Sequence, residues 1–334
     1  MHTLKKIVYY LIVLLSVITI SATLLSLLYD VNVWWIKALD FPRIQLLLLG
    51  GICLLIIVTM THRWTLGSML LAAGLLTSVG LQAYFIYPYT PLSGTDVRSL
   101  DASLASSDAS VSLLIANVYM HNRQVGSLVE VVEEINPDMV LLMETDQWWM
   151  NALQPLRLRY PHVQEYAADN TYGMGLYSRY PWQDMQVKFL QHDSVPSFHA
   201  EVQLPNGQSF WFHGVHPVPP VYSKYPDNEG EEEVALIKVG RMVAQHQQPT
   251  VVAGDFNDVA WSNTSRLFQV EGQLSDTRVG RGLYNSFDAQ SSVMRWPLDH
   301  VYVSGDFALT KLQRLNKFGS DHFPIHAVMV LKEE

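Results

Sequence analysis

The sequence predicts three transmembrane helices followed by a layered α/β domain. Two observations predict this fold class. Long uncharged apolar segments fill most of the first 90 residues, and from Val111 onward short runs rich in β-branched and aromatic residues alternate with turns and helical patterns. We therefore expect residues 1–90 to form a membrane anchor, residues 91–110 a linker, and residues 111–334 a separate α/β domain.

The three apolar segments have the length of membrane spans. Residues 7–28, 44–60 and 66–87 are stretches of 22, 17 and 22 residues without a charge. At about 1.5 Å of rise per residue, the longer two cross a hydrocarbon core of about 30 Å, and the middle one does so with its flanking residues. The first segment is longer than the apolar core of a signal peptide, and two more segments follow it, so we expect it to be retained.

We interpret the three spans as an anchor, because they contain no Asp, Glu, Lys or Arg that could line an ion pathway. Three spans place the two ends of the chain on opposite sides of the membrane. Lys5 and Lys6 favour a cytoplasmic N-terminus, so the C-terminal domain is expected outside the cytoplasm. Cys53 is the only cysteine and lies within the second span, so no disulfide framework is expected.

The segment after the spans has the composition of a linker. Residues 93–110 are poor in apolar side chains and contain no aromatic residue. Only five of the 22 Lys and Arg residues and two of the 31 Asp and Glu residues precede Tyr87, so the remainder of the chain carries a formal net charge of −12. This balance argues against a tight binder of duplex nucleic acid, which is normally basic. It does not exclude an enzyme that holds phosphate through metal ions.

The domain beyond the linker alternates predicted strands with predicted helices. Strands are expected within residues 111–118, 139–144, 173–180, 197–204, 209–216, 249–256, 298–304 and 326–331. Helical patterns cover residues 126–135 and 231–247. Apolar runs that are buried on both faces, with helices between them, are typical of layered α/β proteins. The sequence contains no GxGxxG motif and no P-loop.

Polar side chains mark the ends of these strands. They are Asn117, Glu144, His216, Asp255, Asn257, Asp299, Asp321 and His322. In layered α/β folds, ligands gather at strand ends, where loops carry polar groups on a rigid scaffold. Carboxylates, amides and imidazoles brought together in this way are suited to hold a hard cation and a phosphate group.

Each of these residues also has an ordinary structural explanation. Glu144 could stabilise a helix N-terminus, and Asp299 could pair with Arg295. Residues 254–258 and 319–322 could be turns, since Gly, Asp, Asn and Ser favour turns. His216 could be a half-buried histidine bonded to backbone. Several such coincidences within one domain favour a common site instead.

Seven motifs occur in an order that is shared with a known family. They are IANV (115–118), PDMVLLME (137–144), GMGLYSRYP (173–181), GVHPVPP (214–220), VVAGDFND (251–258), PLDHVYVS (297–304) and GSDHFPI (319–325). In this order the chain resembles the endonuclease/exonuclease/phosphatase superfamily, the DNase I-like fold, and most of all its membrane-anchored bacterial branch. The resemblance covers about residues 111–331. It implies a four-layer α/β sandwich with two packed mixed sheets and a site at one edge.

The resemblance also implies a metal site. Glu144 matches the principal metal carboxylate of the family, with Asn117 beside it and Asp321 reaching the site from the last motif. Oxygen ligands of this kind suit Mg²⁺ or Mn²⁺.

The remaining residues are implied to act on the phosphate. Asp255 matches the residue that positions or deprotonates the attacking water, and Asn257 the residue that holds a phosphate oxygen. His322, partnered by Asp299, is expected to contact the scissile phosphate, and His216 to be a second histidine on the phosphate side. The general base stays open between Asp255 and His322.

Two features depart from the family pattern. His199 lies near a position where many relatives carry a basic residue, so a common arginine contact is expected to be absent or replaced. The acidic stretch from Asp227 to Glu233 follows the His216 loop, where basic residues would suit a nucleic-acid enzyme, and we interpret it as a solvated helix start.

These observations lead to an expected function. We expect a hydrolase of phosphoric ester bonds, anchored in a bacterial inner membrane with its catalytic domain on the outer side. Its substrate is expected to be nucleic acid, a small phosphate ester, or a lipid as in a phospholipid or sphingomyelin-type phosphodiesterase, and the fold by itself does not choose among them. A non-catalytic binding module that kept the fold is the alternative from another class, and the complete set of polar residues argues against it. No obligate protein partner is evident, and the bilayer is the expected surrounding of the anchor.

Overall fold

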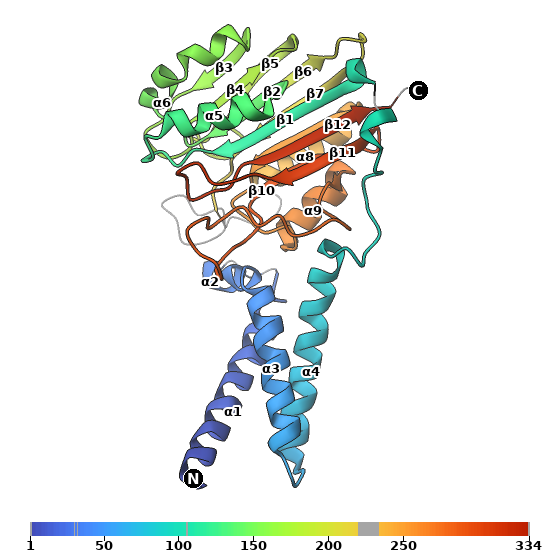
Figure 1. Cartoon of the computed structure of the whole chain (residues 1–334). Coiled ribbons are helices and arrows are strands. Elements are labelled where there is room, and N and C mark those ends of the chain that lie inside the picture. Colours follow the sequence, from blue (N-terminus) through green and yellow to red (C-terminus); the bar gives the residue numbers. More distant parts are fainter. Residues whose placement is uncertain (1, 30, 32, 105, 220–233, 333–334) are drawn as a thin grey trace.

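The computed structural model describes residues 2–29, 31, 33–104, 106–219 and 234–332. They form a bundle of three long helices and an α/β domain, which sits at the end of the bundle away from the N-terminus (Figure 1). The chain therefore separates an apolar helical part from a sheet-containing part, as the sequence predicts.

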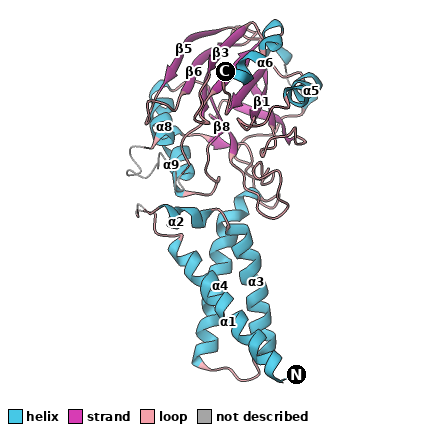
Figure 2. Cartoon of the chain, turned by 90° about the vertical axis from the view of Figure 1, so that its left-hand side faces the viewer, coloured by secondary structure: helices cyan, strands magenta, loops and turns pink. Residues whose placement is uncertain are grey.

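The bundle consists of α1 (His2–Leu25), α3 (Arg43–Met60) and α4 (Leu66–Ile86). Three stretches are long and apolar enough to cross a membrane: Lys6–Leu25, Arg43–Met60 and Leu66–Tyr89. The predicted helices at 7–28, 44–60 and 66–87 are therefore confirmed as helices, with ends shifted by a few residues. The short helices α2 (Trp34–Lys37) and η1 (Ala38–Asp40) connect α1 to α3 and lie across the top of the bundle, below the domain (Figure 2).

One buried charge lies just before the uncharged segment 44–60, because the helix begins one residue earlier than predicted. Arg43 is the first residue of α3 and is fully buried. Its guanidinium pairs with the carboxylate of Asp40, donates to the side-chain oxygen of Gln82 at 3.1 Å, and lies 3.9 Å from the ring centroid of Phe85. Gln82 in turn donates to Thr23 Oγ1 at 3.0 Å. This network joins the three helices at the end next to the domain and satisfies the charge locally.

The domain contains two six-stranded sheets, with strand orders β11-β12-β1-β2-β4-β3 and β5-β6-β7-β8-β10-β9. The strands of the first sheet are β1 (Ser110–Asn117), β2 (Met139–Met143), β3 (His162–Tyr166), β4 (Met174–Ser178), β11 (Phe307–Arg314) and β12 (Ile325–Leu331). Those of the second sheet are β5 (Trp182–Lys188), β6 (Ser197–Gln203), β7 (Ser209–Val215), β8 (Thr250–Asp255), β9 (Ser275–Asp276) and β10 (Asp299–Val303).

Alternating side chains of the central strands build four layers. Leu113 and Ile115 of β1 belong to the apolar cluster between the sheets, whereas Leu114 belongs to a second cluster. That second cluster also holds side chains of α5 (Val125–Ile135) and α6 (Gln147–Ala152). In the same way, Ala253 of β8 faces the first sheet, and Val252 packs with α8 (Ala235–His246) and α9 (Asn263–Gly272). The predicted four-layer α/β sandwich is therefore confirmed.

The structure adds elements that the sequence analysis did not predict. These are β3, β5, β9, β11, α6, α9 and the short helices η2 (Tyr87–Tyr89), η3 (Ala102–Leu104), η4 (Ser107–Ala109) and η5 (Gln154–Leu158). The helix predicted at 231–247 corresponds to α8, which is described from Ala235. The acidic stretch 227–233 lies outside the described residues, so the expectation of a solvated helix start there stays a prediction.

The segment that joins α4 to β1 runs along the domain surface. Val97 is buried in the cluster between the sheets, and Ser99 forms a parallel bridge with Leu309 of β11. Arg281 donates to the carbonyl oxygen of Val97 and to Ser99 Oγ, both at 2.6 Å. These contacts hold the connecting segment against the domain.

Candidate active site

Two parallel strands bring Asn117 and Glu144 together. β1 and β2 are parallel neighbours with Asn117 opposite Met143, so their carboxyl ends meet at the same edge. Asn117 Nδ2 donates to Glu144 Oε1 at 2.9 Å, and the backbone N–H of Met120 donates to Glu144 Oε2 at 3.1 Å. Glu144 has a φ of 60°, a left-handed conformation that often accompanies functional sites when a residue other than glycine adopts it.

Two antiparallel strands of the other sheet bring two carboxylates together. Asp255 of β8 is directly opposite Asp299 of β10. Gly254 allows β8 to pass close to β7, because its φ is 147° and a Cβ there would lie 1.9 Å from the carbonyl oxygen of Val215. The strand register itself thus places the paired carboxylates.

The loop that follows β8 is bonded to the loop that follows β7. The backbone N–H of Asn257 donates to Asp255 Oδ1 at 2.8 Å, and Asn257 Nδ2 donates to the carbonyl oxygen of Pro217 at 3.0 Å. Pro217 follows His216, whose Nε2 lies 3.9 Å from Asp255 Oδ2. Asn257 and His216 therefore both lie beside Asp255.

A turn before β12 carries Asp321 and His322 to the same edge. Ser320 Oγ donates to the carbonyl oxygen of Asn117 at 2.8 Å and accepts from the backbone N–H of His322 at 3.0 Å. β12 pairs with β1, so this turn lies next to the end of β1. The Gly-Ser-Asp sequence forms a turn and also delivers site residues.

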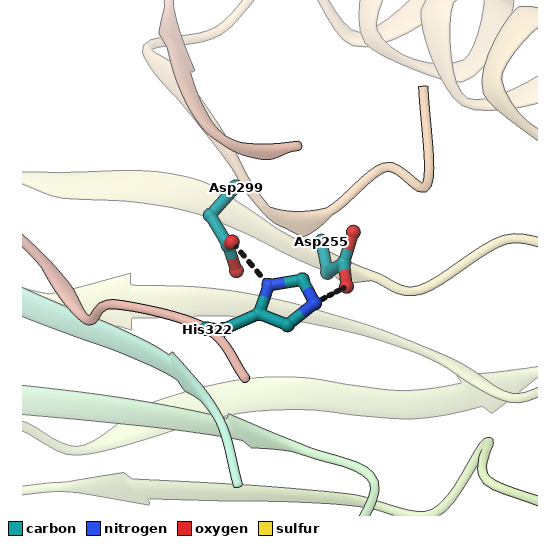
Figure 3. A group of neighbouring side chains, drawn as sticks. All are labelled: Asp255, Asp299 and His322. Carbon is teal, nitrogen blue, oxygen red and sulfur yellow. Dashed lines mark hydrogen bonds and ion pairs between the residues drawn. The ribbon is translucent and has the colours of Figure 1, made fainter. Parts of the chain in front are cut away.

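These side chains form one continuous chain of contacts across both sheets. His322 Nδ1 lies 2.7 Å from Asp299 Oδ2, and His322 Nε2 lies 3.5 Å from Asp255 Oδ2 (Figure 3). Asp255 Oδ2 also accepts from Asn117 Nδ2 at 3.0 Å. The chain then continues from Asn117 to Glu144. All members are buried or half-buried.

The two carboxylates favour a protonated imidazole at His322. Burial alone would lower its pKa, but the facing carboxylates of Asp299 and Asp255 outweigh burial and raise the pKa of His322 to about 10. The geometry agrees, since each ring nitrogen faces a carboxylate oxygen and both must donate. His322 is therefore a cation at neutral pH.

The site holds more carboxyl groups than basic side chains. Burial raises the pKa values of Glu144, Asp255 and Asp321, while the His322 cation opposes this rise. With Asp299, four carboxyl groups surround a single imidazolium. Among the described residues, the hydrogen-bond donors to the oxygens of Glu144 are neutral: the Asn117 amide and the backbone N–H of Met120. A hard divalent cation with oxygen ligands fits this surplus of buried carboxylates.

Another set of possible ligand atoms is better explained by hydrogen bonding. The nearest ligand atoms of Asp255, Asp299 and His322 all lie within 4.8 Å of one another. A metal ligand must be a neutral imidazole, however, and both nitrogens of His322 are engaged with carboxylates. Glu144, whose oxygens accept from neutral donors, is the better candidate for a metal ligand, and the assignment of Asp321 to the same ion stays a prediction.

Two histidines have surroundings that the sequence did not disclose. His216 is buried against the Tyr172 ring, and burial lowers its pKa to about 4 despite the nearby Asp255, so its imidazole is neutral at neutral pH. His199 does not contact the residues described above; its ring lies 2.8 Å from Ser197 Oγ and 2.6 Å from His213 Nδ1. His199 therefore lies outside the group of candidate site residues.

Sequence reasoning missed two residues that contact and position site residues, Ser286 and Phe287. Ser286 Oγ accepts from the backbone N–H groups of Leu298 and Asp299, at 3.2 and 3.0 Å. The Phe287 ring lies 5.0 Å from the His322 ring. Neither residue stands at the end of a predicted strand, and no local signal marks them, because their roles depend on a loop that folds back onto β10.

Comparisons with known proteins agree with this architecture. A family model described as the Endonuclease/Exonuclease/phosphatase family matches residues 114–322, a range that contains all eight candidate residues. No curated protein sequence matches the chain.

Several solved structures share the fold. A Bacteroides vulgatus protein titled endonuclease/exonuclease/phosphatase superposes with a TM-score of 0.52 at 17% identity, covering 67% of this chain and 99% of that chain. D. rerio TDP2 complexed with single strand DNA product gives 0.51 at 15% identity, covering 66% and 99%. The human Nocturnin catalytic domain with bound sulfate anion gives 0.52 at 14% identity, covering 71% and 97%. At these identities the likeness concerns the fold alone.

Proposed function

Because the chain belongs to the Endonuclease/Exonuclease/phosphatase family and is thereby a hydrolase of phosphoric ester bonds, we propose that it is a membrane-anchored phosphoesterase that depends on a divalent metal. In this proposal it cleaves a phosphodiester or phosphomonoester bond by in-line attack of water. The observation that carries the proposal is the continuous chain from Glu144 through Asn117, Asp255 and His322 to Asp299.

In this proposal the metal is held by Glu144, Asp321 and Asn117. Carboxylate and amide oxygens suit Mg²⁺ or Mn²⁺. When bound, the cation would supply charge neutralisation at the phosphoryl oxygens. Asn117 has a further role that needs no metal: its Nδ2 bridges Glu144 and Asp255, while its Oδ1 accepts from the backbone N–H of Tyr119 at 2.9 Å. The amide thereby fixes the spacing of two carboxylates that would otherwise repel each other.

Asp255 is the proposed base. Both nitrogens of His322 must donate to carboxylates, which leaves Asp255 as the acceptor for the proton of the attacking water. Asp255 is buried and is held by Asn117 and by the backbone N–H of Asn257. Its orientation is therefore fixed before substrate binds.

The histidines and Asn257 are proposed to act on the phosphate. The His322 imidazolium would donate to a phosphoryl oxygen through Nε2, exchanging its longer 3.5 Å contact with Asp255, while Asp299 holds the ring through Nδ1. Asn257 Nδ2 donates one of its two hydrogens to the carbonyl oxygen of Pro217, and its second hydrogen would hold another phosphoryl oxygen. Neutral His216 would complete the phosphate side of the pocket.

Anchoring and location belong to the same proposal. The three apolar helices would span a bacterial inner membrane, and Lys5 and Lys6 would keep the N-terminus in the cytoplasm. Because the domain lies at the opposite end of the bundle from the N-terminus (Figure 1), it would face the outer side. The linker at 91–110 would then connect the anchor to the catalytic domain at 111–334.

The test compares the full-length protein with two variants, using bis-p-nitrophenyl phosphate as substrate. We expect turnover with Mg²⁺ or Mn²⁺, none with EDTA, and a loss of about 10²–10⁴ in kcat for Asp255→Asn and for His322→Ala. Asp306→Asn, in the exposed turn before β11, is the matched control and should keep full activity. Turnover that resists EDTA, or an active Asp255→Asn variant, would refute the proposal.

The alternative from another class is a binding module without catalysis. It would be supported by a folded, metal-binding protein that hydrolyses neither the soluble diester, nor plasmid DNA, nor phospholipid. Among substrates, the net charge of −12 beyond the spans disfavours duplex DNA.

A further inference from the structure

The loop that follows Asp255 and carries Asn257 contacts the end of the helix bundle next to the domain. Trp261 Nε1 donates to the carbonyl oxygen of Asp40 at 2.7 Å, and Tyr89 Oη donates to the carbonyl oxygen of Ala260 at 2.9 Å. Val259 and Trp261 share a buried apolar cluster with Phe85 at the end of α4. The site is therefore attached to the membrane-facing side of the domain.

A second loop connects the opposite side of the site to the same helices. The backbone N–H of Ala289 donates to the carbonyl oxygen of Asp321 at 2.7 Å. The Phe287 ring contacts His322, stacks on Trp296 at 6.2 Å between centroids, and Trp296 meets Phe41 edge-on at 5.8 Å. Phe41 lies just before α3. Three successive ring contacts thus lead from the catalytic histidine to the start of a membrane helix.

The tip of this second loop lies at the depth of the membrane surface. Gln45 Nε2 donates to the carbonyl oxygen of Val293 at 2.9 Å. Gln45 is the third residue of α3, an 18-residue helix. At about 1.5 Å per residue, 18 residues span roughly 27 Å, so nearly the whole helix is needed to cross a core of about 30 Å. A group bonded to Gln45 therefore lies at the boundary between headgroups and acyl chains.

The loop tip has the surface chemistry of that boundary. Val293 and Met294 are 68% and 47% exposed, although both are apolar. The next residue is Arg295. Its guanidinium lies 5.0 Å from the centroid of the Phe323 ring, and that of Arg314 lies 4.4 Å from the same centroid. Apolar tips flanked by cations favour an interface with anionic lipid. The exposed indoles of Trp34 and Trp35, in α2 on top of the bundle, are also typical of this level.

We propose that residues 291–295 are seated in the lipid interface and that the active site hydrolyses a phosphate ester carried by a membrane lipid. This inference rests on the proposed phosphoesterase function and names its substrate class. Water adds to phosphorus through its oxygen, one P–O ester bond breaks, and the proton released by water is returned to the departing alkoxide. The products are a phosphomonoester and an alcohol when the substrate is a diester.

The first test measures depth and needs no activity. In a Cys53→Ala background, an environment-sensitive dye is attached to Met294→Cys or, as the control, to Leu158→Cys. Leu158 is 92% exposed in η5, the short helix after α6, and α6 lies on the side of the domain away from the bundle (Figure 1). In liposomes with bromines on the upper acyl carbons, the dye at 294 should be quenched and the dye at 158 should not. Equal quenching at the two positions would overturn the proposal.

The second test compares substrates on the full-length protein in liposomes of phosphatidylethanolamine and phosphatidylglycerol. We expect hydrolysis of vesicle phospholipid in addition to bis-p-nitrophenyl phosphate. For Val293→Asp/Met294→Asp, the ratio of lipid to soluble-diester turnover should fall by about tenfold, since each charge facing an anionic surface shifts binding by roughly this order. Leu158→Asp should leave the ratio unchanged.

The outcomes distinguish failure of the lipid proposal from failure of the phosphoesterase function. Turnover of the soluble diester without any cleavage of vesicle lipid, or with cleavage of plasmid DNA in its place, would overturn the lipid proposal and leave the phosphoesterase function intact. Absence of turnover on every substrate would overturn the function itself. An unchanged ratio in the double variant would show that residues 293 and 294 do not act at the interface.

Discussion

At the residue scale, Asp299 is the side chain whose role can be isolated most cleanly. Its Oδ2 faces His322 Nδ1, and an asparagine at 299 could still accept that hydrogen bond through its oxygen. Only the negative charge behind the imidazolium would be lost. We expect Asp299→Asn to lower kcat by about 10²–10⁴, with a change in the free energy of unfolding of less than about 2 kcal/mol. Steady-state kinetics and thermal unfolding measure the two effects.

A second buried aspartate provides the control for this prediction. Asp276 pairs with Arg278 at 2.7 Å, and both side chains are buried in a part of the sheet that carries no proposed catalytic group. Asp276→Asn leaves a buried arginine uncompensated and should cost about 3–5 kcal/mol of stability. The kcat of its folded fraction should stay near that of the wild type. An Asp299→Asn variant that loses stability and keeps its kcat would show that Asp299 is only structural.

The sequence discloses site residues that stand in recognisable positions. Asp255, Asp299 and His322 lie next to apolar runs, so strand ends and motif order together point to them. Ser286 and Phe287 were missed because their contacts depend on a loop whose course no local pattern predicts. The roles proposed for the individual residues stay predictions until the variants are measured.

At the element scale, the loop after β8 depends on the helices for its support. Trp261 is almost fully buried and bonds to the backbone of η1. We expect Trp261→Ala to cost about 3–5 kcal/mol, as for other large buried side chains, and to lower activity because Asn257 belongs to the same loop. Trp148→Ala is the matched control. Trp148 is 40% exposed; its ring meets that of Trp149 edge-on and lies under the Arg123 guanidinium, a cation–π contact worth about 0.5–1 kcal/mol. Urea unfolding of the detergent-solubilised chain measures the difference, and equal losses would contradict this account.

The helices and strands that were not predicted have side chains of mixed exposure, without a clear apolar pattern. β5 (WQDMQVK) combines exposed and half-buried positions without a clean apolar alternation, and it lies at the edge of its sheet. α9 (NTSRLFQVEG) has few apolar residues, and Phe268 alone carries much of its buried face. Central strands such as β1 and β8 were predictable because they are buried on both faces.

At the scale of the whole molecule, the order of motifs predicts the sandwich, but nothing local predicts how the sandwich meets the bundle. The contact between Trp261 and the carbonyl of Asp40 joins residues 221 positions apart.

The same junction contains a carboxyl group that should influence how stability varies with pH. Burial raises the pKa of Asp258 to about 7. A hydrogen bond from Ser262 opposes this rise, and the nearby Asp40 carboxylate adds to it.

A buried histidine in the other sheet has the opposite effect. Burial, with Lys311 nearby, lowers the pKa of His326 to about 4, and Ser112 Oγ lies 2.8 Å from its Nε2. As the pH falls from about 6.5 to 4, unfolded chains protonate this histidine first, so His326 removes stability. As the pH falls from about 7 to 4, the folded state protonates Asp258 first, so Asp258 adds stability. The two groups therefore give pH slopes of opposite sign.

Variants at the two positions separate these slopes. Relative to the wild type, Asp258→Asn should gain stability as the pH rises from 4 to 7, because the cost of ionising a buried carboxyl is removed. His326→Gln should gain stability relative to the wild type as the pH falls from 6.5 to 4. The wild type loses stability in this range because only its unfolded state protonates His326, and glutamine does not titrate. Each change should reach at most about 1.4 kcal/mol per pH unit. Urea unfolding at several pH values measures both, and slopes of the same sign for the two variants would mean that burial does not control these groups.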